Sequence, residues 1–132
     1  MKAKLQPVYL PDRNDREMQE FEAQLTNLKA MYGEEAEFLE PIAIGTQIPQ
    51  DVDALVFPQL IGSAFRQREA FGNIQKPIIA LTSSFGTVEM WDWEIVSFLR
   101  EELGCTVFAP YAVELAKVIL RALGCKSALR EG

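Results

Sequence analysis

The chain has 132 residues, of which 48% are hydrophobic, and its 13 Lys and Arg against 19 Asp and Glu give a net charge of −6. This composition is typical of one globular domain; the acidic balance argues against nucleic-acid binding, and the absence of histidine excludes Ser–His and Cys–His nucleophile pairs. No apolar run reaches the roughly 18 residues of a membrane span and no signal-peptide core is present, so we expect a cytoplasmic protein that binds neither membrane nor nucleic acid.

Short apolar runs alternate with amphipathic stretches, a pattern that predicts β–α units around a parallel sheet. The first strand is expected at residues 7–10, and a helix begins at Asn14 or Asp15 and ends at Gly33. The buried stripe of that helix consists of apolar residues at steps of three and four: Met18, Phe21, Leu25, Leu28 and Tyr32.

The alternation continues to the end of the chain, with strands at residues 36–39, 54–57, 77–81 and 105–109, and helices at residues 60–71, 88–103 and 112–123. Residues 41–51 show no helical pattern, and Gly124 is expected to end the last helix. The pattern predicts an α/β fold, a three-layer α/β/α sandwich with a five-stranded parallel sheet in flavodoxin-like order 2-1-3-4-5. Residues 1–124 are expected to form a single α/β domain, and residues 125–132 a polar tail or a linker to missing domains.

The two cysteines, Cys105 and Cys125, each follow a Leu-Gly pair that is typical of a helix end. The helix expected between them is about 18 Å long, which exceeds the ~7 Å limit on the Cα separation in a disulfide. Cytosolic thiols also stay reduced. We therefore expect two free, buried cysteines.

Ligands of parallel α/β sheets bind at the carboxyl ends of the strands. The loops there contain no phosphoacceptor aspartate, no hydroxyl-rich flavin phosphate loop and no glycine-rich nucleotide motif. Residues 82–87 follow the fourth expected strand and offer hydroxyls and helix N-terminal amides that can hydrogen-bond an anion or a polyol. The alternative is that Ser84 or Thr87 only caps the next helix.

Two further polar side chains are expected just after the carboxyl ends of strands. Gln59 follows the third expected strand, and Arg13 follows the first. Each can hydrogen-bond a sugar hydroxyl, and each can equally be a solvated surface group.

The helix expected at residues 88–103 has large apolar residues on two faces. Its core-facing stripe consists of Val88, Trp91, Ile95, Phe98 and Leu99. Met90, Trp93 and Val96 lie on another face, and a helix that is apolar on two sides is covered on two sides. We therefore predict that Met90 and Trp93 form an interface with a partner subunit or another domain; the alternative is that Trp93 is a single exposed aromatic residue.

Two stretches carry a family resemblance: residues 54–62, ALVFPQLIG, and residues 81–94, LTSSFGTVEMWDWE. They resemble the N-terminal domain of L-fucose isomerase-like sugar isomerases, relatives of L-fucose and L-arabinose isomerase, and the resemblance continues through residues 107–111 and 120–124. It implies interconversion of an aldose and a ketose through an enediol. In such enzymes a manganese-type divalent ion is held by acidic residues and a histidine of a later domain. We therefore expect no catalytic residue, metal or other cofactor in this chain, and no activity from the chain alone.

The resemblance also implies which residues and partners matter. In the relatives, the N-terminal domain builds the oligomer and lends loop residues to the sugar site of a neighbouring subunit. By position, the implied substrate-binding residues are Arg13, Gln59, Ser83, Ser84, Phe85, Gly86, Thr87 and Trp91. The implied partners are a sugar substrate, the missing C-terminal catalytic domains and further copies in a homo-oligomer. The alternative function is a stand-alone small sugar-binding or regulatory α/β domain without catalysis.

Overall fold

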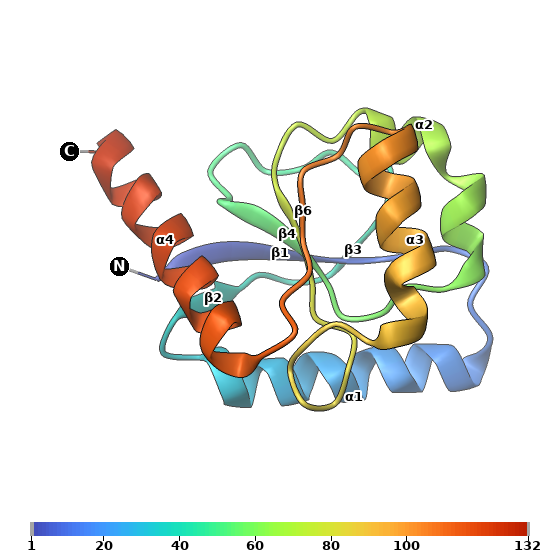
Figure 1. The fold of residues 1–132 in the computed structure, drawn as a ribbon, viewed down its shortest axis with the longest axis horizontal. Helices are drawn as coiled ribbons and strands as arrows, with labels where there is room; N and C mark the ends of the chain where they lie inside the picture. The colour runs from blue at the N-terminus through green and yellow to red at the C-terminus, as the bar shows by residue number, and fades with distance from the viewer. Residues whose placement is uncertain (1, 132) are drawn as a thin grey trace.

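The computed structural model describes residues 2–131, and the side chains of residues 2–125. Its strands are β1 (Ala3–Tyr9), β2 (Ala36–Phe38), β3 (Ile42–Ala43), β4 (Ala54–Phe57), β5 (Ile78–Ala80) and β6 (Val107–Phe108). Its helices are α1 (Asp15–Tyr32), η1 (Gly62–Arg66), α2 (Arg68–Gly72), η2 (Met90–Asp92), α3 (Trp93–Ser97), η3 (Phe98–Glu102) and α4 (Val113–Glu131). The strands pair in parallel, which confirms the predicted α/β class with a parallel sheet (Figure 1).

The strands follow the order β2-β1-β4-β5-β6 along the sheet, and β3 pairs with the second half of β1. The sequence predicts five strands, so β3 is an additional strand, in the segment that has no helical pattern. β2 separates from β1 after Phe38, and β3 pairs with it from Ile42. In the gap, the buried Gln6 amide donates to the carbonyl oxygens of Pro7 (2.9 Å) and Glu40 (2.6 Å), so these backbone groups have partners.

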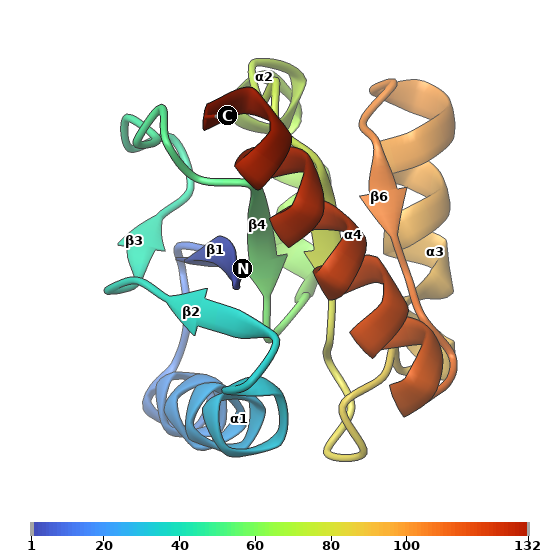
Figure 2. The ribbon, with the colours of Figure 1, turned by 90° about the vertical axis from the view of Figure 1, so that its left-hand side faces the viewer.

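Two hydrophobic clusters take alternate residues of the strands, as the strand period of two requires. One cluster joins the strands to α1 through Leu28 and Tyr32 and to α4 through Leu120. The other joins the strands to α2 through Phe71 and to α3 and η3 through Val96 and Leu99. α1 and α4 therefore share one cluster, and α2 and α3 share the other (Figures 1 and 2).

The first helix agrees with its prediction. Asn14 is its N-cap residue: the Asn14 side chain accepts from the Glu17 N–H at 2.7 Å, and the Glu17 side chain accepts from the Asn14 N–H at 3.0 Å. The predicted stripe is buried at Phe21, Leu25, Leu28 and Tyr32, whereas Met18 is 44% exposed. Gly33 follows the last helical residue.

The single helices predicted at residues 60–71 and 88–103 are wrong in detail. The first consists of the 3-10 turn η1 followed by the short α2. The second begins two residues later than predicted and joins a 3-10 turn (η2), one stretch of α-helix (α3) and a π-helical turn (η3). These turns wind by different angles per residue, so a constant 3.6-residue period gives the wrong face for some side chains.

The last helix continues through Gly124, which does not end it. α4 reaches Glu131, so the predicted polar tail is helical as far as that residue, and Gly132 lies outside the described residues. Glycine within a helix costs only about 1 kcal/mol, and the Lys, Ala, Leu and Arg residues beyond it favour helix.

The two cysteines are free, as predicted. Cys105 is half-buried and Cys125 is exposed, so the expectation that both are buried is wrong for Cys125. Within residues 2–131, no helix combines the length and the apolar character needed to cross a membrane.

Candidate functional site

The loops that follow β4 and β5 line a depression of about 340 Å³, which we call the carboxyl-edge pocket. The first turns of α1 form its other side. Its lining residues are Glu17, Glu20, Gln24, Pro58, Gln59, Leu60, Ile61, Thr82, Ser84, Glu89, Trp91 and Asp92. This is the edge of a parallel sheet at which ligands bind.

The hydroxyls of the loop after β5 bond mainly to the loop itself. The buried Ser83 Oγ lies 2.9 Å from Thr87 Oγ1 and accepts from the Phe85 N–H at 3.1 Å. Thr82 Oγ1 accepts from the Glu89 N–H at 2.9 Å, which ties the loop to the residue before η2. The alternative that Ser84 or Thr87 caps the next helix is wrong, since neither η2 nor α3 has a side-chain cap. Ser83 and Thr87 therefore shape the loop, and only Thr82 and Ser84 of these four line the pocket.

One face of α1 holds this loop in place. The Gln24 amide donates to the carbonyl oxygens of Leu81 (2.8 Å) and Ser83 (2.7 Å), and the Asn27 amide donates to that of Ser84 (2.9 Å). The buried Tyr32 hydroxyl donates to the Gly86 carbonyl at 2.6 Å. α1 therefore fixes the wall of the pocket to the sheet at several points.

Gly86 is a structural residue of the loop. Its φ of +80° lies in the left-handed region that favours glycine. A Cβ at this position would lie 2.6 Å from Met31 Cε and 2.8 Å from the Tyr32 hydroxyl oxygen. Gly86 therefore has a packing role in the loop, and its implied contact with a ligand stays a prediction.

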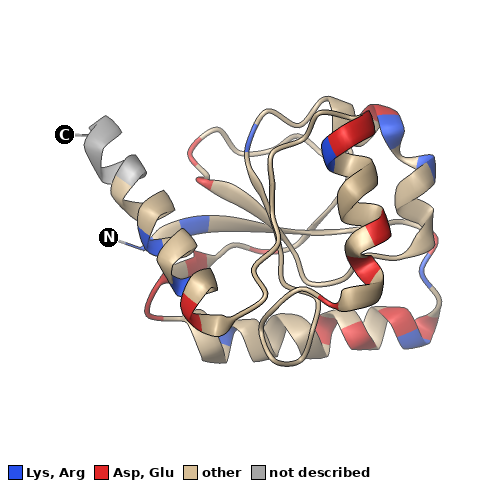
Figure 3. Ribbon diagram, in the orientation of Figure 1, with Lys and Arg blue, Asp and Glu red and all other residues tan. Residues whose placement is uncertain are grey.

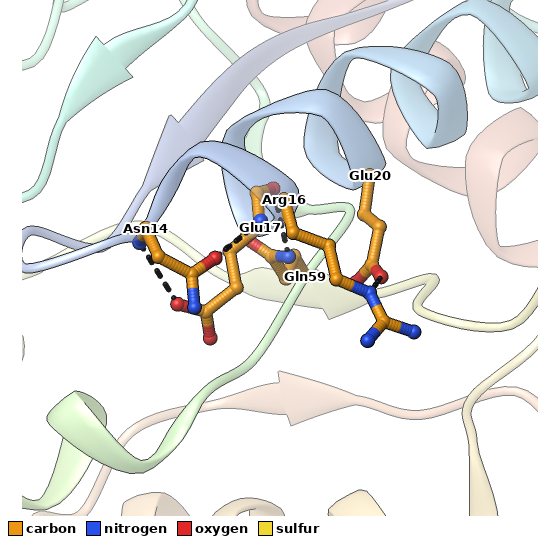
Figure 4. A network of polar contacts seen from close by, with 5 residues as sticks. All are labelled: Asn14, Arg16, Glu17, Glu20 and Gln59. Carbon is orange, nitrogen blue, oxygen red and sulfur yellow. Dashed lines mark hydrogen bonds and ion pairs between the residues drawn. The ribbon is translucent and has the colours of Figure 1, made fainter.

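Gln59 lies in the pocket as predicted, between β4 and the start of α1. Its amide nitrogen donates to the Glu17 carbonyl oxygen at 3.1 Å, on the first turn that the Asn14 capping box fixes (Figure 4). Nearby, Arg16 pairs with Glu20 at 3.0 Å (Figure 4). The hydrogen bond from Gln59 to the Glu17 carbonyl orients the Gln59 amide at the pocket.

Arg13 does not join this site. Its guanidinium carbon lies 4.1 Å from the centre of the Tyr9 ring and 5.2 Å from that of Phe21. It lines a separate depression on the far side of α1, together with Met18 and Lys29. The cation–π contacts give Arg13 a packing role in the described structure.

Trp91 lines the pocket, but it does not face the core. Its side chain belongs to η2 and is 77% exposed, whereas Val96, predicted on the second face, is fully buried. The predicted positions of Trp91 and Val96 are wrong because the prediction continues a regular α-helical period from residue 88, whereas the helical segment begins at Met90 with a 3-10 turn. Trp91 therefore presents its indole to the pocket and to solvent.

Four large apolar side chains on the loops after β5 and β6 and on η2 are exposed, and one of them, Trp91, lines the pocket. We call the four together the aromatic rim. It consists of Phe85, Met90, Trp91 and Tyr111, each 76–81% exposed. The Val88 N–H donates to the Pro110 carbonyl at 2.9 Å, which brings the loop after β6 beside the loop after β5. Large apolar groups gathered in this way are typical of an interaction surface.

The predicted interface pair divides between two environments. Met90 belongs to the aromatic rim, whereas Trp93 is only 39% exposed. The Arg100 guanidinium carbon lies 5.5 Å from the centre of the Trp93 ring. Trp93 is therefore partly covered by its own helix.

Four carboxylates line the pocket: Glu17, Glu20, Glu89 and Asp92. Acidic residues occupy both the first turns of α1 and the start of α3 (Figure 3). Burial raises the pKa of Asp92 above its usual value; a hydrogen bond with the Thr82 side chain opposes this rise, and the Glu89 charge adds to it. The sequence analysis named Thr82 only through the hydroxyls of residues 82–87, and it did not single out Asp92, which lies in the helix expected at residues 88–103.

These carboxylates do not form a metal centre. Among the described residues, no group of three or more His, Cys, Asp or Glu side chains is placed to hold a metal ion. What the pocket offers is amide and hydroxyl groups, carboxylate acceptors and one indole face.

A second depression, of about 350 Å³, lies where residues 41–51 replace a crossover helix. Ile42, Ile44, Ile48 and Ile74 line it, and we call it the isoleucine depression. It is flanked by neutral amides and by Lys76, which donates to the Gln50 carbonyl at 3.0 Å. Because fewer polar side chains converge there, the carboxyl-edge pocket is the better candidate for a specific polar ligand.

Compared with protein-family models, curated proteins and solved structures, the chain gives no match. The family resemblance of residues 54–62 and 81–94 stays a prediction from the sequence.

Replacing Gly86 with alanine should destabilise the fold more than the same change at Gly45. Both glycines have positive φ, +80° and +90°, so both variants carry backbone strain of about 1–3 kcal/mol. Only at Gly86 does the added Cβ meet other atoms, since nothing lies within 4 Å of the Gly45 Cβ position. Urea unfolding should show a further loss of roughly 1–3 kcal/mol for Gly86→Ala. Equal losses would contradict the packing role.

Tyr32 should ionise well above the usual pH range of a tyrosine. Burial raises the pKa of Tyr32 to about 12, with contributions from Glu35 and Glu114. The folded state therefore disfavours the phenolate, and stability is lost as the pH rises from about 10 through 12. Absorbance titration should resolve this late transition in the parent and not in Tyr32→Phe. If absorbance shows that all tyrosines of the chain ionise together in the usual range while circular dichroism shows the chain to be folded, the prediction for Tyr32 is wrong.

Proposed function

We propose that the carboxyl-edge pocket binds a sugar, and that the chain is the substrate-site and oligomer-assembly domain of an aldose–ketose isomerase whose metal ligands lie in another domain. The observation that carries the proposal is the pairing of an exposed indole, Trp91, with the polar side chains of Gln59, Ser84 and Asp92 around one depression at the carboxyl edge. The resemblance of residues 81–94 supports the reaction class.

The chemistry of the pocket suits a polyol. Each sugar hydroxyl both donates and accepts a hydrogen bond, so it can pair with an amide, a hydroxyl or a carboxylate. The C–H face of a sugar ring is apolar and can cover the indole of Trp91, whose side chain is otherwise 77% exposed. In the proposed function the chain binds and orients the sugar, and the proton transfers belong to the missing catalytic domains.

The assembly role is supported by the aromatic rim. Phe85, Met90 and Tyr111 extend the apolar surface of Trp91 beyond the pocket, and Met and aromatic residues are enriched in protein interfaces. A neighbouring subunit or the missing C-terminal catalytic domains docked on this rim would cover the apolar side chains and close the open side of the pocket. This is why we expect a homo-oligomer and propose Phe85 as an interface residue.

We also propose that the fold is a three-layer α/β/α sandwich of the flavodoxin-like type. Counted without β3, the strands follow the flavodoxin-like order 2-1-3-4-5, and the two hydrophobic clusters support a three-layer α/β/α sandwich. In such a fold the ligand lies at the carboxyl edge, where the loops after β4 and β5 meet.

The indole of Trp91 should report sugar binding. In Trp93→Phe, Trp91 is the only tryptophan, and titration with neutral aldoses and ketoses should change its fluorescence with a Kd on the order of 10 mM, as expected of half a site. The matched control is Trp91→Phe, which keeps Trp93 and should give no saturable change. No saturable response from Trp91 with any aldose, ketose or alditol would contradict the proposal.

The purified chain should show no isomerase activity on pentoses or hexoses, with or without manganese. It has no histidine, and the described residues hold no group of metal ligands. The assay compares the chain with a mock purification from the same host, which reveals contaminating isomerases. Metal-dependent turnover above the mock preparation would overturn the assignment of the metal site to another domain.

A further inference from the structure

Asp92 differs from the other three carboxylates of the carboxyl-edge pocket because it is buried. Its residue is 6% exposed, whereas Glu17 and Glu89 are half-buried and Glu20 is exposed. It nevertheless lines the pocket. A buried carboxylate at a pocket wall is costly unless it gains partners there.

Helix capping does not account for Asp92. It occupies the N-cap position of α3, where an Asp side chain usually accepts from a backbone N–H two or three residues later. The Asp92 side chain makes no such bond, and its backbone is itself helical, with φ −84° and ψ −5°. The turn η2 runs directly into α3, so no cap is needed at this point.

Thr82 lines the pocket with Asp92, and its side chain favours the charged form of Asp92. The Thr82 oxygen accepts the Glu89 N–H at 2.9 Å, so its hydroxyl hydrogen is still available to a carboxylate. A carboxylate has about four acceptor positions, so a bond from Thr82 leaves capacity for a ligand. The raised pKa of Asp92 indicates that Thr82 does not offset the cost of burial.

We infer that the Asp92 carboxylate accepts a hydroxyl hydrogen of the sugar that covers Trp91, and that Asp92 is a specificity-determining residue of the pocket. This inference rests on the proposed function. Asp92 is buried at the pocket wall and makes no capping bond to α3, and the ligand hydroxyl supplies the partner that the buried carboxylate lacks. A sugar without that hydroxyl leaves the carboxylate buried and under-bonded, and it binds more weakly.

The first test compares Asp92→Asn with Glu94→Gln, a charge-neutralising control at an exposed residue of α3 that does not line the pocket. Trp91 fluorescence in the Trp93→Phe background measures the affinity for a neutral aldose. Asp92→Asn should weaken binding roughly tenfold to a hundredfold, because a hydrogen bond to a charged acceptor is lost, and Glu94→Gln should not change it.

Thermal unfolding of the same variants separates a ligand role from a structural role. Since the folded state disfavours the charged form of Asp92, Asp92→Asn should melt at a higher temperature than the parent at neutral pH. That gain should shrink as the pH falls toward the usual Asp range, where Asp92 itself takes up a proton. A lower melting temperature at neutral pH would mean that the carboxylate stabilises the fold, and would overturn the inference.

The affinity for the aldose can also be measured as a function of pH in the chain that keeps Asp92. This test does not depend on whether Asp92→Asn folds. Affinity should fall as Asp92 takes up a proton, in a transition displaced above the usual Asp range. Glu17, Glu20 and Glu89 also face the pocket, so the control is Glu89→Gln: removing this charge should move the transition to lower pH without abolishing it. An affinity that does not change with pH would overturn the inference.

The two proposals fail in different ways. If the chain binds a neutral sugar and Asp92→Asn binds it equally well, the role of Asp92 is wrong and the sugar pocket stands. If no neutral sugar binds the chain at any pH, the proposed function is wrong, and the inference about Asp92 falls with it.

Discussion

The hydrogen bond from the buried Tyr32 hydroxyl to the Gly86 carbonyl, 2.6 Å long, is the constraint on which the candidate site depends. It joins the end of α1 to the tip of the loop after β5, where Gly86 has a positive φ. Nothing larger than glycine fits between Met31 and Tyr32 without displacement, so the turn packs closely against the end of α1. The loop therefore reaches η2 in a fixed direction, which places Trp91 at the pocket.

The start of α1 matters as much as its end. The Asn14 capping box fixes the first turn, and that turn supplies the Glu17 carbonyl that orients Gln59 (Figure 4). The middle of the helix holds the backbone of the loop through Gln24. One helix thus positions two walls of the pocket, so in the proposed function the binding of a sugar depends on the stability of α1. Substitutions far from the ligand, on the buried face of α1, would then weaken binding through the geometry of the pocket.

The sequence predicted the α/β class and the first helix because both depend on regular periods and clear end residues. β3 could not be predicted, since two residues paired by backbone hydrogen bonds leave no period in the sequence. The error on Trp91 has a geometric cause: a 3-10 turn rotates each residue further than an α-helix does, so the predicted core stripe was out of phase. Asp92 was missed because the burial of a carboxylate depends on tertiary packing, which leaves no period in the sequence. The reaction class rests on resemblance alone.

The most direct test of the proposal that the carboxyl-edge pocket binds a sugar is an amide and indole chemical-shift map of the ¹⁵N-labelled chain titrated with a neutral aldose. The structure predicts that the largest shifts fall on the Trp91 indole N–H and on the amides of Gln59, Ser84 and Asp92, which line one depression. Chemical-shift changes confined to residues of the isoleucine depression, or to the loop around Cys105 at the opposite edge of the sheet, would contradict sugar binding at the carboxyl-edge pocket.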